Sequence, residues 1–151
     1  MSDTTMNDAE RNAFLSETHI AVLAVASGSD RPPLAVPLFY HYAPDGNFLF
    51  FTNTQGRKSR KLGLISSAGV LGMTVQDENF PYKYVRAECS VVSIDQPPAF
   101  DAAFQIARRY MPVEDARGFV ETELNHPDGR FTVITASPVR WDSQDVSKEA
   151  E

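Results

Sequence analysis

The sequence predicts a mainly β domain of the α+β class, a small antiparallel barrel of six strands with helices filling its gaps. Six apolar segments have the length of strands, and Pro-Asp-Gly turns stand at residues 44–46 and 127–129. Most segments follow one another through tight turns, which favours antiparallel pairing over a doubly wound parallel sheet. The expected strands are residues 19–26, 34–42, 48–52, 70–76, 82–94 and 131–141.

Each expected strand rests on a local pattern. Residues 19–26 form an unbroken apolar run of strand length. The second strand contains Pro37, which removes one backbone donor and suits an edge or a bulge. The first Pro-Asp-Gly turn joins it in a hairpin to the third strand. The fifth strand, residues 82–94, is long and has mixed alternation.

Helices are expected where capping residues or helical spacing occur. Asn7 can cap the first helix, with Glu10 three residues later in the position of a capping box. Phe100 and Phe104 have helical spacing after a Pro-Pro pair. The last helix is more polar, and its carboxylates, including Glu123, are interpreted as a solvated face. The expected helices are residues 7–16, 57–65, 99–110 and 114–124.

Length and composition predict one domain over residues 1–151, ending in a polar tail from about residue 143 that frays. No apolar run reaches the roughly 20 residues of a membrane span, and the N-terminal segment lacks the pattern of a secretory signal. A single cysteine, Cys89, permits no internal disulfide, so we expect a cytoplasmic protein. The net charge of −6 argues against a nucleic-acid partner.

A basic cluster is the most informative feature. Four of the 14 Lys and Arg residues stand at positions 57, 58, 60 and 61, in the first turns of an expected helix. Cations are disfavoured at that end of a helix, and a bound anion reverses the penalty. Thr52 and Thr54 add hydroxyl donors, and Gly56 permits close backbone approach. The cluster indicates a phosphate site, and the alternative is a solvated basic helix face.

Other chemistry is sparse. Aromatic residues crowd the second and third strands, where they can stack on a planar ring or simply fill the core. The histidines, His19, His41 and His126, lack the spacing of a metal site, and no metal is expected. Cys89 falls inside a strand pattern and is interpreted as a buried small hydrophobe. No catalytic acid or base is selected by the sequence.

The segment Phe51-Thr52-Asn53, then Gly56-Arg57-Lys58 and Leu62, resembles the phosphate-binding signature of the pyridoxamine 5′-phosphate oxidase-like flavin split barrels. Residues 20–25 and 34–40 are similar to the first two strands of that family, and residues 67–75 and 84–88 to later ones. The resemblance extends over about residues 14–141. It implies a six-stranded split barrel, a homodimer, and two cofactor sites across the dimer interface.

The resemblance also implies roles for individual residues. Arg57 and Lys58 hold the cofactor phosphate, Thr52 donates a hydrogen bond to it, and Lys61 assists an anionic tail. Tyr84 falls where some members place a glutamine near the ring. The implied cofactor-binding set is Val36, Pro37, Leu38, Phe39, Phe51, Thr52, Asn53, Arg57, Lys58, Lys61 and Tyr84.

Two departures weaken vitamin B6 oxidation as the activity: the basic segment on the second strand and the arginine-rich C-terminal motif are both absent. The chain is more similar to the compact members that use FMN or the deazaflavin coenzyme F420, and Arg60 and Lys61 suit the longer F420 anion. The expected function is hydride transfer between the cofactor and a small conjugated substrate, with Tyr40, Tyr82 or Tyr84 as proton donor. The alternatives are a flavin or F420 carrier or sensor, and a haem-handling protein with a histidine ligand.

Overall fold

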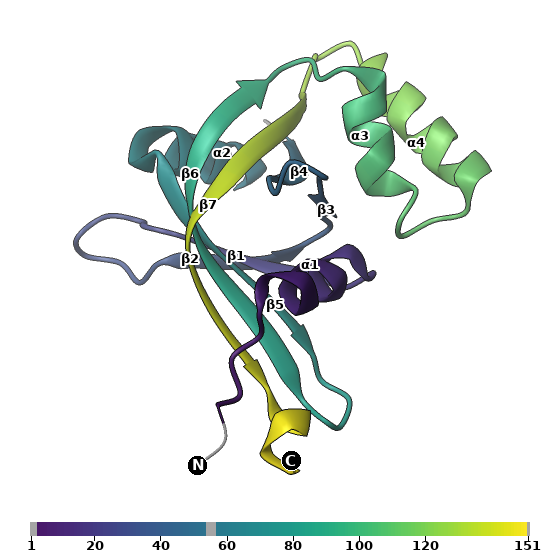
Figure 1. Ribbon diagram of the computed structural model, residues 1–151. Coiled ribbons are helices and arrows are strands. Elements are labelled where there is room, and N and C mark those ends of the chain that lie inside the picture. Colours follow the sequence, from purple (N-terminus) through teal and green to yellow (C-terminus); the bar gives the residue numbers. More distant parts are fainter. Residues whose placement is uncertain (1–2, 54–56, 151) are drawn as a thin grey trace.

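The computed structural model describes residues 3–53 and 57–150, with residues 53, 57–59 and 150 described by their backbone alone. Seven strands form one sheet in the order β2-β1-β5-β6-β7-β4-β3, and every neighbouring pair is antiparallel. The long strands β6 and β7 arch across the molecule, and the sheet curls into a half-barrel (Figure 1). The strands are β1 (Ala21–Val25), β2 (Leu34–Leu38), β3 (His41–Tyr42), β4 (Phe48–Asn53), β5 (Val70–Asp77), β6 (Lys83–Asp95) and β7 (Phe131–Asp145).

The α+β fold class and the antiparallel barrel are confirmed, but the number of strands is seven rather than six. The expected strand at residues 34–42 is two strands, β2 and β3, separated by Phe39 and Tyr40. These two strands are the opposite edges of the sheet. The two-residue link therefore joins the β2 edge of the sheet directly to the β3 edge. Because the link is short, these two edges lie close together in the curled sheet.

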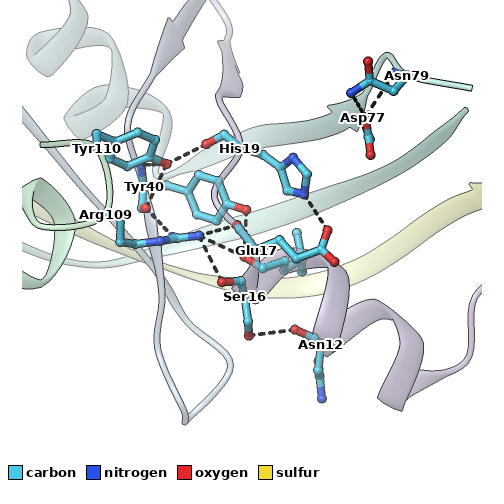
Figure 2. Close-up of polar contacts among 10 residues, drawn as sticks. Asn12, Ser16, Glu17, His19, Tyr40, Asp77, Asn79, Arg109 and Tyr110 are labelled. Carbon is cyan, nitrogen blue, oxygen red and sulfur yellow. Dashed lines mark hydrogen bonds and ion pairs between the residues drawn. The ribbon is translucent and has the colours of Figure 1, made fainter.

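Side chains from the turn that follows α3 replace strand pairing at this link. The Tyr40 amide donates to the Tyr110 hydroxyl at 3.1 Å, and the Arg109 guanidinium donates to the Tyr40 carbonyl (Figure 2). The Tyr110 hydroxyl also lies 2.6 Å from the His19 carbonyl, to which it can donate. Because both backbone groups of Tyr40 are satisfied by side chains, the strand can end here without a buried unpaired group.

The helices follow the sequence signals closely. The capping box of Asn7 and Glu10 is present, with Asn7 Oδ1 accepting from the Glu10 amide at 2.8 Å and Glu10 Oε1 from the Asn7 amide at 2.9 Å. Helices α3 and α4 lie side by side at the end of the sheet away from both termini (Figure 1). The helices are α1 (Asp8–Ser16), α2 (Arg57–Ala68), α3 (Phe100–Ala107) and α4 (Val113–Leu124), and the 3-10 helix η1 covers Val146–Ala150.

Two apolar cores hold these elements. The larger fills the barrel and includes the fully buried side chains of Tyr40, Phe48 and Phe50. The smaller joins α3 and α4 to β7, with Ile106 and Val120 fully buried. No helix in the described part of the chain has the length and apolarity to cross a membrane.

The expectation that the polar tail frays is wrong. Strand β7 continues to Asp145, whose amide donates to the Thr4 carbonyl at 2.8 Å. Lys148 follows in η1, and its Nζ lies 2.7 Å from Glu10 Oε1 and 2.9 Å from the Thr5 carbonyl. The polar residues of the tail therefore bond to the N-terminal segment, which sequence composition does not reveal.

Candidate functional site

A cavity of about 310 Å³ lies where β2, β4, α2 and α4 meet. Strand β2 contributes Pro37 and Leu38, followed by Phe39 in the link to β3. Strand β4 contributes Phe51 and Thr52. The remaining lining residues are Lys61 from α2, Phe119 and Glu123 from α4, and Phe131 from β7.

Aromatic rings form one wall of this cavity. The Phe51 ring centroid lies 5.5 Å from that of Phe119, 5.4 Å from that of Phe131 and 6.4 Å from that of Phe39. The Phe39 ring is stacked on that of Tyr110, with 4.0 Å between the ring centroids and an angle of 7° between the planes. A rigid aromatic wall of this kind suits contact with a planar ring.

Thr52 is the polar feature of the cavity that lacks a partner. It is 5% exposed, and in the part of the chain that the structure describes its Oγ1 has no hydrogen-bond partner. A buried hydroxyl without a partner costs roughly 1–3 kcal/mol. A ligand with an acceptor oxygen at this position removes that cost, so Thr52 fits the role of a ligand donor.

Helix α2 reaches the same cavity through Lys61. The helix begins at Arg57, four residues after β4 ends at Asn53, and its first turn contains no acidic residue. Lys61, one turn further along, lines the cavity. Free amides at the start of a helix favour an anion, so the backbone and Lys61 suit a ligand with negative charge.

Glu123 closes the cavity from the α4 side, and its interpretation as part of a solvated face is wrong. Its side chain is 16% exposed, and both carboxylate oxygens bond to Arg130, at 3.1 Å to Nε and 3.2 Å to the second terminal nitrogen. Phe119, Glu123 and Phe131 are lining residues that the sequence did not single out. The signal available was the i, i+4 spacing of Phe119 and Glu123 on one helix face.

Solved structures of known proteins share this architecture. A conserved hypothetical protein of Mycobacterium tuberculosis matches with a TM-score of 0.76 and 18% identity, covering 100% of this chain and 92% of that one. An F420 reductase matches at 0.61 and 18% identity, covering 87% and 94%. A putative pyridoxamine 5′-phosphate oxidase of Listeria innocua matches at 0.63 and 12% identity, covering 89% and 95%.

The fold is the pyridoxamine 5′-phosphate oxidase-like split barrel. The haem storage protein of Vibrio cholerae shares it, with a TM-score of 0.63, 12% identity and coverage of 91% and 93%. No family model matches the sequence, and no curated protein does. At these identities the likeness shows the fold alone.

In this split barrel, six of the eleven residues implied by the resemblance line one cavity: Pro37, Leu38, Phe39, Phe51, Thr52 and Lys61. Val36 is instead half-buried and packs against the larger core. Tyr84 is not a lining residue. It pairs with Gln144, where β6 begins and β7 ends, and its ring centroid lies 6.0 Å from that of Tyr82.

Part of the basic signature lies outside what is described. The backbone of Asn53 is in β4, and the backbones of Arg57 and Lys58 are in α2, but their side chains are not described. Thr54 and Gly56 lie outside the described residues altogether. Arg60 donates a hydrogen bond to Ser27 and does not line the cavity.

The tyrosines considered as proton donors are not lining residues of the cavity either. Tyr40 is fully buried, and its hydroxyl donates to the Leu15 carbonyl at 2.7 Å. Burial raises the pKa of the Tyr40 hydroxyl well above its usual value. The Tyr82 hydroxyl bonds to Gln76 at 3.2 Å. Cys89 is buried, and burial raises its thiol pKa to about 12, which disfavours the reactive thiolate.

The three histidines are dispersed over the molecule. His19 stacks on Phe14 with ring centroids 4.5 Å apart, and His126 lies beside Asp128 in a turn. His41 is half-buried, and its pKa is lowered mainly by burial and then by the charges of Arg109 and Arg108, with Asp45 opposing them. Within the described residues no cluster of His, Cys, Asp or Glu is arranged to hold a metal ion.

We expect His41 to reduce stability in acid. Because its pKa is lower in the folded state than in the unfolded chain, folding disfavours the protonated ring, and stability is lost as the pH falls below the unfolded value of about 6.5. The His41→Asn variant should therefore lose less free energy of unfolding than the wild type between about pH 7.5 and about pH 5.5. Urea unfolding at both pH values measures this loss, with His126→Asn as the control. The expectation is contradicted if His41→Asn loses as much free energy of unfolding as the wild type and His126→Asn do.

Proposed function

We propose that the cavity beside Thr52 binds a phosphorylated flavin or deazaflavin, FMN or coenzyme F420. The observation that carries the proposal is the buried Thr52 hydroxyl, which lines the cavity and has no partner among the described residues. The aromatic wall and helix α2, whose Lys61 lines the cavity, support it. The shared fold of an F420 reductase and of a putative pyridoxamine 5′-phosphate oxidase supports it further.

Residues of β4, α2 and β2 share the binding of the cofactor. Thr52 donates to the phosphate, and Arg57 and Lys58 supply positive charge at the first turn of α2. The segment from Pro37 to Phe39 lies along the ring system. Lys61 lines the cavity and supplies a further cation for the anionic tail of F420. Arg60 is bonded to Ser27 instead, so it does not favour F420 over FMN.

The proposed activity is that of an oxidoreductase acting on a small conjugated substrate. The bound cofactor supplies the hydride chemistry, and the chain binds and orients it. Among the residues that the structure describes, Glu123 and Lys61 are the ionisable ones that line the cavity, and Glu123 is held by Arg130. With few acid–base groups at the cavity, a carrier or sensor without turnover is the second candidate function.

We further propose a homodimer with the cofactor sites at its interface. Small and apolar residues share the outer face of β2, β1 and β5, where Val22 pairs with Pro37 and Thr74, and Ala24 with Ala35 and Gly72. Val22 is 38% exposed. Pro37 belongs both to this face and to the cavity lining, so a second copy on the face covers the edge of the cofactor site.

Parallel titration with FMN, F420 and haem, followed by turnover, tests the proposed function. We expect saturable binding of FMN or F420, followed by reduction of an enone, quinone or nitro compound when reductant is supplied. Tight cofactor binding without turnover of any acceptor supports the carrier function instead. Binding of haem in preference to both flavins, seen as a Soret band, contradicts the proposal.

Thr52→Val should weaken cofactor binding about five- to tenfold, because it removes one hydrogen bond worth roughly 1–1.5 kcal/mol. Thr132→Val is the matched control. Thr132 stands directly opposite Thr52 on β7, is fully buried, and its hydroxyl also lacks a partner among the described residues, but it does not line the cavity. Fluorescence titration of both variants measures the difference, and equal affinities would remove Thr52 from the site.

A further inference from the structure

A second and larger cavity, of about 800 Å³, lies between α1, the β3–β4 hairpin, the C-terminal end of α3 and β7. No residue that the structure describes lines both this cavity and the one beside Thr52. The Phe39–Tyr40 link separates the two, since Phe39 lines the smaller cavity and His41 the larger. Its volume falls within the range of small-molecule sites, about 300–1,000 Å³.

The charge of the larger cavity is positive, although the chain has a net charge of −6. Arg11, Arg108 and Arg109 line it, and Asp45 is the one carboxylate among the described residues that line it. Asp45 accepts hydrogen bonds from the amide and side chain of Asn47, at 3.0 and 3.2 Å. Its charge therefore lies in the turn, bonded to neutral groups, and does not pair with the arginines.

The three arginines differ in how their charges are balanced. Arg11 pairs with Asp8 at 3.2 Å, but Asp8 is 89% exposed and outside the cavity lining. Arg109 donates to backbone carbonyls of Tyr40 and Glu17, which carry no net charge. Arg108 is exposed and has no ion-pair partner in the described part of the chain. At least two guanidinium charges therefore face this cavity without a carboxylate.

A buried donor in the wall has no acceptor. Arg11 Nε is buried and lacks a hydrogen-bond partner among the described residues. The same guanidinium lies 4.0 Å from the ring centroid of Trp141, which also lines the cavity. A ligand acceptor oxygen near Arg11 satisfies a group that is otherwise costly to bury.

The wall also offers aromatic surface. Trp141 and Tyr42 both line the cavity, with ring centroids 6.5 Å apart and planes at 77°. The Tyr42 hydroxyl is fixed by Asn12 at 2.9 Å, which keeps the ring in place. A ligand that combines a flat ring with a single anionic group matches aromatic surface on one side and arginine forks on the other.

We propose that this second cavity binds an aromatic carboxylate, with Arg108 holding the carboxylate and Trp141 and Tyr42 contacting the ring. Arginine is suited to this role because its fork binds both carboxylate oxygens at once. The site is separate from the proposed flavin cavity, since none of its described lining residues belongs to that cavity.

Trp141 makes the proposal directly testable, because it is the only tryptophan in the chain. Its fluorescence is followed on the full chain during titration with benzoate, and with benzamide as the uncharged control. We expect a saturable change with benzoate and at least about tenfold weaker binding of benzamide. Calorimetry of the same titrations provides affinities that do not depend on fluorescence.

Variants locate the binding. Arg108→Gln should weaken benzoate binding at least about tenfold, and the matched control Arg31→Gln removes an exposed arginine outside the cavity and should change nothing. Arg57→Ala/Lys58→Ala should bind benzoate as the wild type does, which separates this site from the flavin cavity. The proposal is overturned by the absence of saturable benzoate binding, by equal binding of benzamide, or by equal affinities of Arg108→Gln and Arg31→Gln.

Discussion

The Arg57→Ala/Lys58→Ala variant is expected to lose at least about 100-fold in affinity for FMN or F420. Each charge-assisted contact to a phosphate contributes roughly 1.5–3 kcal/mol, so two removed together cost about 3 kcal/mol or more. The two residues open α2, where the helix amides already favour an anion. Fluorescence titration of the variant against the wild type measures the loss.

The control for this variant is Arg31→Ala/Lys83→Ala, which removes the same charges from positions that do not line the cavity. Its affinity should remain within about twofold of the wild type. If both double variants weakened binding equally, the effect would come from the overall charge of the protein. If neither did, the basic cluster would be a solvated helix face.

Arg109→Met is expected to destabilise the fold by about 3 kcal/mol. The guanidinium donates to the carbonyls of Tyr40 and Glu17, and lies 4.6 Å from the Tyr40 ring centroid (Figure 2). Methionine preserves much of the apolar stem but removes the guanidinium donors to these carbonyls, at roughly 1–3 kcal/mol, and removes a cation–π contact of about 1 kcal/mol. Urea unfolding near neutral pH measures the change in free energy.

Arg108→Met is the matched control, because the neighbouring side chain is exposed and has no ion-pair partner in the described chain. Its stability should change by less than about 0.5 kcal/mol. Equal destabilisation of the two variants would mean that the link between β2 and β3 does not depend on Arg109.

The helices and most strands were predictable because their signals are local. The capping box at Asn7 and the Pro-Asp-Gly turns fix element boundaries through residues three or four positions apart. The break between β2 and β3 was not predictable. It depends on Arg109 and Tyr110, about 70 residues away in sequence, and Phe39 and Tyr40 themselves continue the pattern of a strand.

Some residues of the candidate site were likewise predictable from the sequence, and others were not. The segment from Pro37 to Phe39 and the residues Phe51, Thr52 and Lys61 were named from sequence, and the fold brings them to one cavity. Glu123 was missed because a carboxylate on a polar helix has the pattern of a solvated face, and its partner Arg130 lies beyond the turn that follows. Tyr84 was named from its position in the resemblance alone, and that position lies near the far end of the long strands.

The phosphate dependence of cofactor binding tests the central claim most directly. Wild-type protein is titrated with FMN and riboflavin, and with F420 and its riboflavin-like core that lacks phosphate and tail. The account predicts that the phosphorylated member of one pair binds at least about tenfold more tightly than its partner. Equal affinities within both pairs, or no saturable binding of any of the four, would contradict the assignment of a phosphate to Thr52 and the start of α2.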